Sequence, residues 1–260
     1  MLIRDIINGL NDWSPINRAN GNDFMIYGGS DRDVSKIAVC MIATPNVLRK
    51  AKELGAEFII THEPTFHESL KRYNGEDNYF NDKVYLAKKQ LVKEIDIPIY
   101  RFHDYSHFTE VDKINAGFVK KLALSGTFDG QRTFTLDTPV TVYELESEIK
   151  NKLGLFHIRF IGKRNKRVKN ISLCVGACGD ACVYNELNRE GIDLVICGEV
   201  TEYSVCEYVR DSAQLGVDMA LFLLGHMGSE RAGMEYVCDH INSTMSGIKA
   251  IYIESDEVYV

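Results

Sequence analysis

Histidine and carboxylate side chains gather at three places in this sequence. Five of the seven histidines fall into these clusters, and each cluster includes an acidic residue. Imidazole nitrogens mixed with carboxylate oxygens are typical ligands of zinc, iron, manganese or nickel. The pattern therefore predicts a divalent metal site. The clusters are His62, Glu63 and His67; His103, Asp104 and His107; and His226 with Glu230.

Each cluster follows a short apolar segment that has the composition of a β-strand. The first strand, residues 57–61, should end before Pro64, because proline cannot donate to a sheet ladder. It would then project His62 and Glu63 beyond its carboxyl end, where ligands bind in open α/β sheets. A single histidine is more often structural or simply exposed. Three clusters at equivalent strand ends favour a shared metal site instead.

Apolar and amphipathic segments alternate along the whole chain, which is typical of an α/β protein. Thr44 followed by Pro45 predicts the start of a helix, and Thr141 with Glu144 forms a capping box at another. We therefore expect mixed or mostly parallel sheets. The expected strands are 36–44, 57–61, 97–102, 156–161, 171–175, 193–197, 217–224 and 249–254, and the expected helices are 45–54, 82–94, 113–124, 141–154, 180–190, 201–215 and 229–241. Residues 2–10 form a short amphipathic segment.

Two polar stretches, residues 17–33 and 68–80, are predicted to be loops. A glycine-containing stretch at 125–130 is the candidate domain boundary. The length of 260 residues suits two domains better than one. We therefore expect two α/β lobes, residues 1–127 and 128–260, with the second lobe contributing the last metal ligands.

Composition excludes several classes of protein. A hydrophobic content of 45% with 26% charged residues is that of an ordinary soluble protein, and the formal charge of −7 disfavours nucleic-acid or anionic-membrane binding. No apolar run approaches the roughly 18 residues of a membrane span, and the first residues do not resemble a secretory signal. Seven cysteines without framework spacing suit a reducing compartment. We expect a cytoplasmic protein.

Two further motifs have both a structural and a functional interpretation. Cys174, Cys178 and Cys182 are spaced by three residues, which matches neither the usual zinc pattern nor the ferredoxin runs. Small buried thiols are therefore the preferred interpretation, with an iron–sulfur or zinc site as the alternative. The basic run at 163–169 lies between two expected strands, so we interpret it as a solvated turn rather than a phosphate or nucleic-acid contact.

Four segments, taken in order, resemble the Nif-three-like dinuclear-metal family, whose members are also described as type 2 GTP cyclohydrolase homologues. The resemblance covers most of the chain, and it lies in the ordered set rather than in any single motif. The segments are Ile60 to Phe66; Arg101 to Asp104, closed by His107; Gly198 with Glu199; and Gly225, His226, Ser229 and Glu230.

Two positions depart from the family pattern, and the two changes in ligand charge cancel. Family members usually carry a second histidine where this chain has Glu63, and an aspartate where it has His107. The total ligand charge is unchanged, as a pair of dications would require. A further family aspartate is replaced by Ile42. Asp104 is an addition, and it could bind metal or orient His107.

The resemblance implies two lobes with two divalent ions in the cleft between them, and a homo-hexameric ring built as a trimer of dimers. The ions would be zinc, iron, manganese or nickel. The implied metal ligands are His62, Glu63, Asp104, His107, His226 and Glu230.

Two metals about 3.5–4 Å apart can lower the pKa of a bridging water and hold both oxygens of a displacement. The favoured function is therefore a metal-dependent hydrolase of a small substrate, nucleotide-like compounds included. His67, Glu199 and Tyr105 are the candidates for a general base. The alternative is a non-catalytic metal-binding ring that serves as a scaffold or binds a partner.

Overall fold

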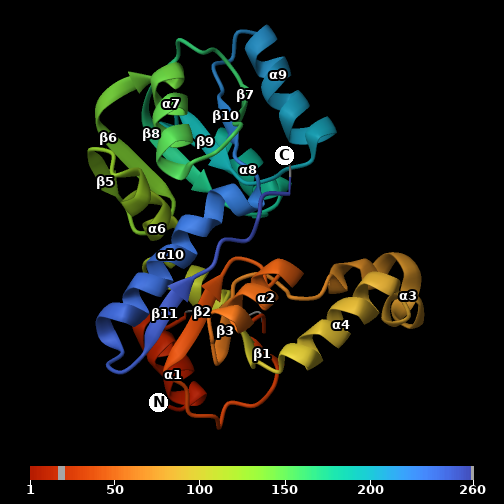
Figure 1. Ribbon diagram of the computed structural model, residues 1–260. Coiled ribbons are helices and arrows are strands. Elements are labelled where there is room, and N and C mark those ends of the chain that lie inside the picture. The colour runs from red at the N-terminus through yellow and green to blue at the C-terminus, as the bar shows by residue number, and fades with distance from the viewer. Residues whose placement is uncertain (17–20, 259–260) are drawn as a thin grey trace. The chain divides into compact units, whose positions relative to one another are not determined.

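The computed structural model describes residues 1–16 and 21–258, and the chain divides into two compact units (Figure 1). The first unit comprises residues 1–110 and 234–256, and the second comprises residues 111–233 and the segment after 256. The boundary drawn from the sequence at 127/128 falls inside the second unit. Residues 234–256 return to the first unit, so this unit is built from two separate stretches of chain.

The first unit contains a five-stranded sheet in the order β1-β4-β3-β2-β11. Strands β4, β3, β2 and β11 run parallel to one another, and β1 is an antiparallel edge strand. The predicted strand–helix–strand unit around α2 (Pro45–Glu53) is confirmed, and Thr44 caps this helix through the Val47 N–H. The strands are β1 (Phe24–Tyr27), β2 (Lys36–Cys40), β3 (Phe58–Thr61), β4 (Ile99–Arg101) and β11 (Lys249–Tyr252).

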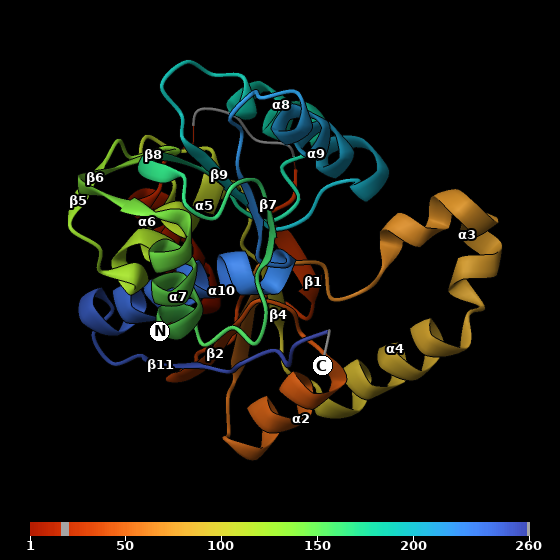
Figure 2. The ribbon, with the colours of Figure 1, turned by 90° about the horizontal axis from the view of Figure 1, so that it is seen from above.

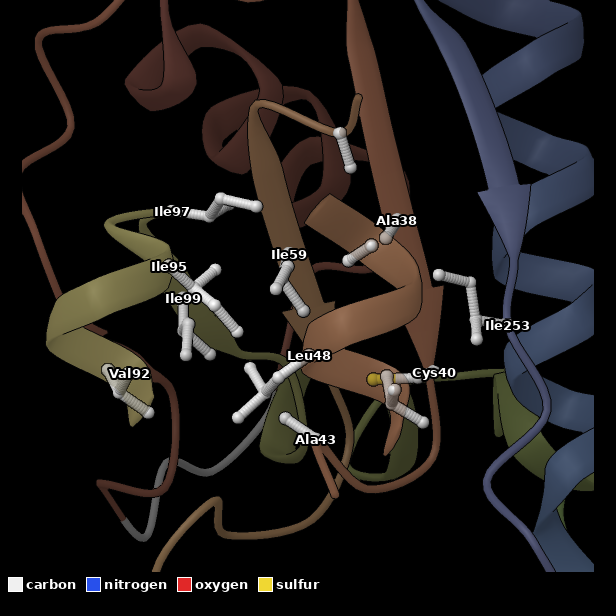
Figure 3. Close-up of a cluster of buried hydrophobic side chains, with 13 residues drawn as sticks. Ala38, Cys40, Ala43, Leu48, Ile59, Val92, Ile95, Ile97, Ile99 and Ile253 are labelled. Atoms are coloured by element: carbon white, nitrogen blue, oxygen red, sulfur yellow. The ribbon is translucent and has the colours of Figure 1, made fainter. Parts of the chain in front are cut away.

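Helices cover both faces of this sheet. On one face, α2 and α4 (Lys83–Ile95) pack on β2, β3 and β4, and Figure 3 shows Leu48, Val92 and Ile59 in the same cluster of buried side chains. Alternate residues of the same strands point to the other face and are also buried. That face is covered by α1 (Ile3–Trp13) and the C-terminal part of α10 (His226–Thr244), where the rings of Trp13 and His240 stack at 3.8 Å.

Two segments that we predicted to be loops contain regular structure. The stretch 17–33 includes β1, although residues 17–20 lie outside the described residues. The stretch 68–80 forms a short 3-10 turn, Glu68–Leu70, and helix α3, Lys71–Phe80. Figure 2 shows α3 at the end of α4 that lies away from the sheet. Gly75, with φ of 75°, interrupts α3, and this break explains why helical periodicity is weak in the sequence.

The second unit contains a six-stranded mixed sheet in the order β5-β6-β8-β9-β10-β7. The three central strands β8, β9 and β10 are parallel, whereas the outer strands pair antiparallel. The sequence prediction missed β5 and β6. The strands are β5 (Gly126–Phe128), β6 (Thr133–Thr141), β7 (Arg159–Ile161), β8 (Arg167–Cys174), β9 (Leu194–Cys197) and β10 (Leu221–Leu223).

Helices lie on both faces of the second sheet as well. Side chains of α8 (Asp180–Leu187) and α9 (Glu207–Gln214) form one core layer with β8, β9 and β10. On the opposite face, Phe118 and Leu122 of α6 (Lys113–Leu122) lie against Phe134 and Ile171. Helix α7 (Val142–Leu153) begins with the predicted capping box, and a π-helical turn, Glu202–Cys206, precedes α9. Within residues 1–16 and 21–258, no helix is long and apolar enough to cross a bilayer.

Candidate metal centre

Three histidines converge beyond the carboxyl ends of neighbouring strands in the first unit. His62 follows β3, His103 follows β4, and His107 ends the short helix α5 (Asp104–His107). Each offers a ring nitrogen, and these atoms all lie within 4.8 Å of one another. The Nε2 atoms of His62 and His107 are 3.2 Å apart. Two nitrogens on one tetrahedral zinc ion lie about 3.3 Å apart, so this spacing fits metal binding.

The hydrogen bonds of the other ring nitrogens fix how two of these histidines are presented. The Nδ1 of His62 contacts the Phe102 carbonyl at 3.1 Å, and the Nδ1 of His103 contacts the Asp104 carboxylate at 3.1 Å. A carbonyl or carboxylate accepts from N–H, so each ring keeps its proton on Nδ1 and offers Nε2 as a lone-pair donor.

Burial favours the neutral, metal-binding form of His62 and His103. The His62 side chain is fully buried. Burial, and then the neighbouring His103 and His107, lower the pKa of His62 well below its usual value. Burial followed by His107 also lowers the pKa of His103. A metal ligand must be deprotonated, so the cluster is prepared for a cation near neutral pH.

Glu63 adds a carboxylate at the edge of the histidine cluster. One of its oxygens lies within 4.8 Å of a His62 ring nitrogen. Arg101 holds Glu63 through an ion pair of 3.3 Å, and its Nε donates to the His62 carbonyl at 3.1 Å. The arginine therefore fixes both residues that follow β3. An oxygen donor beside three nitrogens matches the mixed ligand set expected from the sequence.

Asp104 is fully buried and holds His103 in place. Its carboxylate accepts from His103 and, at 2.8 Å, from the Asn22 side-chain amide. The Asp23 carboxylate in turn accepts from the backbone N–H groups of His103 and Asp104, at 2.7 and 2.8 Å. This arrangement is typical of a carboxylate that orients a histidine ligand from behind. We had expected Asp104 either to bind metal or to orient His107; its bond to His103 favours an orienting role.

The second unit holds its own donor set at the start of α10. His226 contacts Glu230 through Nε2 at 3.1 Å and Glu199 through Nδ1 at 3.2 Å. Glu230 is buried, and Glu199 is exposed. The Ser229 hydroxyl donates to the His226 carbonyl and accepts from the Gly176 N–H, both at 2.9 Å. These bonds fix the first turn of α10 against the end of β8.

The three general-base candidates lie in different surroundings. Glu199 belongs to the donor set of the second unit. Tyr105 is half-buried in α5, and its carbonyl accepts from the Ser14 hydroxyl. His67 is exposed and lies outside the groups of metal-type ligands found among the described residues. It lines a cavity of about 250 Å³ together with Tyr79 and Lys88.

The structure thus brings together most of the ligands expected from the sequence within each unit. In the first unit His62 lies beside His107 and also beside Glu63, and in the second unit His226 contacts Glu230. The resemblance does not name His103 as a ligand, and the sequence leaves open whether it touches a metal, although it also follows a strand. Its position next to Asp104, which can orient an imidazole, was the signal that could have identified it.

The fold and these donor sets define a protein of two α/β units with metal-type sites rich in histidine and carboxylate. Residues 1–257 match the model of the family Duf34/NIF3 (NGG1p interacting factor 3). The chain belongs to this family, as the ordered motifs in the sequence led us to expect.

Relatives extend over nearly the full length of the chain. A protein of Clostridium perfringens named "GTP cyclohydrolase 1 type 2 homolog" is 27% identical over 242 residues, which cover 88% of this chain and 87% of that protein. Among solved structures, Staphylococcus aureus protein SA1388 has a TM-score of 0.78 at 17% identity, covering 100% and 98% of the two chains. A Bacillus cereus protein related to NIF3 has a TM-score of 0.76 at 13% identity, covering 100% and 99%. These structures share the fold.

Proposed function

We propose that this protein is a metal-dependent hydrolase that acts on a small substrate, with nucleotide-like compounds as the first candidates. The observation that carries the proposal is the convergence of His62, His103 and His107, whose ring nitrogens meet beyond two parallel strands. The name of the Clostridium perfringens relative, a homologue of a GTP cyclohydrolase, guides the choice of substrates.

The residues present fit divalent ions of the zinc, iron, manganese and nickel group. Imidazole nitrogens and carboxylate oxygens suit these borderline cations, whereas magnesium and calcium prefer oxygen alone. In the first unit His62, His103, His107 and Glu63 would serve as ligands. In the second unit His226 and Glu230 would do so.

Bound divalent ions would supply Lewis acidity and would lower the pKa of water toward neutrality. The protein's own groups then have separate tasks. Asp104 and the Phe102 carbonyl hold two imidazoles in a fixed tautomer. Glu199 reaches solvent while one of its oxygens contacts His226, so it can accept a proton from water and pass it to solvent.

The test is turnover by protein loaded separately with each of the four metals, assayed against phosphoester, amide and nucleotide substrates. His107→Asn should lose metal and at least 100-fold in rate for whichever substrate is hydrolysed. His157→Asn, which changes an exposed histidine of the second unit, should keep both. A fully loaded wild-type protein that turned over none of the substrates would contradict the hydrolase and favour a non-catalytic metal protein.

We further propose two divalent ions per chain, and we expect each donor set to contribute to metal binding. His62→Asn in the first unit and Glu230→Gln in the second are the informative pair. Each should reduce the metal content of purified protein, measured by elemental analysis against protein concentration. If Glu230→Gln kept the full wild-type metal content, the second donor set would not be a metal site.

The family resemblance also motivates the proposal of a homo-hexamer in the cytoplasm. Light scattering coupled to size exclusion should give six times the chain mass of 29.4 kDa. A monomer or dimer at micromolar concentration would contradict the ring.

A further inference from the structure

Three cysteines of the second unit meet at a site that the proposed hydrolase does not use. Cys174 is the last residue of β8, Cys178 lies in the following turn, and Cys182 lies in the first turn of α8. Their Sγ atoms all lie within 4.8 Å of one another. Cys174 is buried, whereas Cys178 and Cys182 are half-buried. Our interpretation of three small buried thiols therefore does not account for their convergence.

A guanidinium group lies against this sulfur cluster. The Nη1 of Arg132 is 2.7 Å from the Cys182 Sγ and 3.6 Å from the Cys174 Sγ. The backbone of Arg132 is fixed on both sides. Its N–H donates to the Asp129 carboxylate at 2.8 Å, and its carbonyl accepts from the Leu173 N–H at 2.8 Å. The positive charge is thus held beside the sulfurs by the fold rather than by a flexible surface contact.

We propose that Cys174, Cys178 and Cys182 form a trithiolate site for a thiophilic d10 cation, with Zn²⁺ as the reference ion. Sulfurs on one tetrahedral zinc ion lie about 3.8 Å apart, within the spacing observed here. Three thiolates and one Zn²⁺ carry a net charge of −1, which the Arg132 guanidinium compensates. Binding involves no electron transfer: each thiol that becomes a ligand releases its proton to solvent.

The surroundings of the cluster suit such an ion. Cys197 faces Cys174 across the β8–β9 register but is not one of the three converging thiols, and it contributes to an apolar wall with Val183 and Val205. The two half-buried thiols leave the cluster open on the other side, so a cation can enter without unfolding. The spacing of three residues is unusual for zinc because the ligands come from a strand end, a turn and a helix start rather than from one zinc knuckle.

The site is tested by titrating reduced, chelator-treated protein with Cd²⁺ and recording sulfur-to-metal charge-transfer absorption. Histidine and carboxylate ligands do not give this signal, so the experiment is independent of the histidine cluster. Wild-type protein should bind one thiolate-coordinated Cd²⁺ per chain, and Zn²⁺ in large excess should compete with it, because thiolates bind the softer Cd²⁺ more tightly. His62→Asn should give the same absorption as the wild type.

Cys182→Ser should lose most of the absorption, whereas Cys238→Ser, which changes a buried cysteine of the first unit, should keep it. Arg132→Gln leaves all three ligands in place and should weaken Cd²⁺ binding by about tenfold, because a hydrogen bond to a charged group contributes on this order. Circular dichroism checks that each variant is folded.

A second measurement covers the case in which Cys182→Ser fails to fold. Bound Cd²⁺ should slow alkylation of Cys178 and Cys182 in the wild-type protein at least tenfold, as read by mass spectrometry of the peptides. Absence of charge-transfer absorption in the reduced wild type, or equal alkylation rates with and without Cd²⁺, would overturn the proposal.

Discussion

The backbone of Gly176 lies directly against the carboxylate of Glu230: a Cβ atom on residue 176 would be 2.6 Å from the carboxyl carbon. Such a contact is far too short, and a φ of 63° at this position adds strain for any residue with a side chain. The position of Glu230 therefore depends on a glycine two residues after the end of β8.

Gly176→Ala should displace the Glu230 carboxylate and lower both stability and metal content. We expect a loss of about 1–3 kcal/mol in the free energy of unfolding, from strain and displacement together. Gly191→Ala is the matched control, because φ there is 82° but no atom lies within 4 Å of the added Cβ. Urea unfolding and elemental analysis measure the two effects. Equal metal loss in both variants would show that strain alone is responsible.

Asp104→Asn should weaken metal binding without removing a ligand. The amide keeps the shape of the carboxylate but no longer supports the Nδ1 proton of His103 with a negative charge. Loss of such a partner lowers metal affinity by about 10–100-fold. Competition with a chromogenic chelator gives the affinity, and Asp12→Asn, at an exposed aspartate, serves as the control. An unchanged affinity would mean that His103 is not oriented through Asp104.

Glu199→Gln should separate proton transfer from metal binding. The amide can still contact His226, but it cannot accept a proton. Because Glu199 also accepts from His226, the comparison is made on protein saturated with metal, where we expect turnover to fall by about 100-fold or more while assembly is retained. His67→Asn provides the comparison, because His67 is also a candidate base but lies in a separate cavity beside Lys88. Should Glu199→Gln retain full activity, another group must act as the base.

Lys88 should make the stability of the protein depend on pH in the alkaline range. Only 6% of this residue is exposed, and burial lowers the pKa of its amine to about 8. Between pH 8 and about 10.5 the unfolded chain binds more protons than the folded one, so the free energy of unfolding should rise with pH. At pH 7 the charged, buried amine costs stability.

Lys88→Met should remove that pH dependence and stabilise the protein at pH 7 by an amount on the order of 3 kcal/mol. Denaturant unfolding at pH 7, 8, 9 and 10 measures both effects. Lys89→Met, at the exposed neighbouring position, should keep the wild-type slope. A Lys88→Met variant that is less stable than wild type at pH 7 would contradict this account.

The buried parallel strands could be predicted from the sequence because they are short, apolar and followed by a recognisable signal. β3 is buried at all four residues and stops at the polar pair before Pro64. β6 was missed for the opposite reasons. It contains Asp137 and Pro139, and its pairing with β8 is irregular between Thr135 and Val140. Such a strand depends on its neighbours rather than on its own periodicity.

The candidate site was predictable in its chemistry but not in its details. Residue types and strand ends identified His62, His107 and His226 as members of donor clusters. The sequence could not assign Asp104 to His103, because that contact depends on how α5 turns after β4. Likewise, the meeting of the three cysteines requires the turn after β8, which no pattern of spacing specifies.

The pairing of β11 with β2 has a consequence for biosynthesis. Residues 249–252 complete the first sheet beside residues 36–39, which leave the ribosome more than two hundred residues earlier. Until then the apolar edge of β2 has no strand on that side and is open to pairing with other nascent chains. Chaperone binding during translation should therefore concentrate on this edge and end when the last strand emerges.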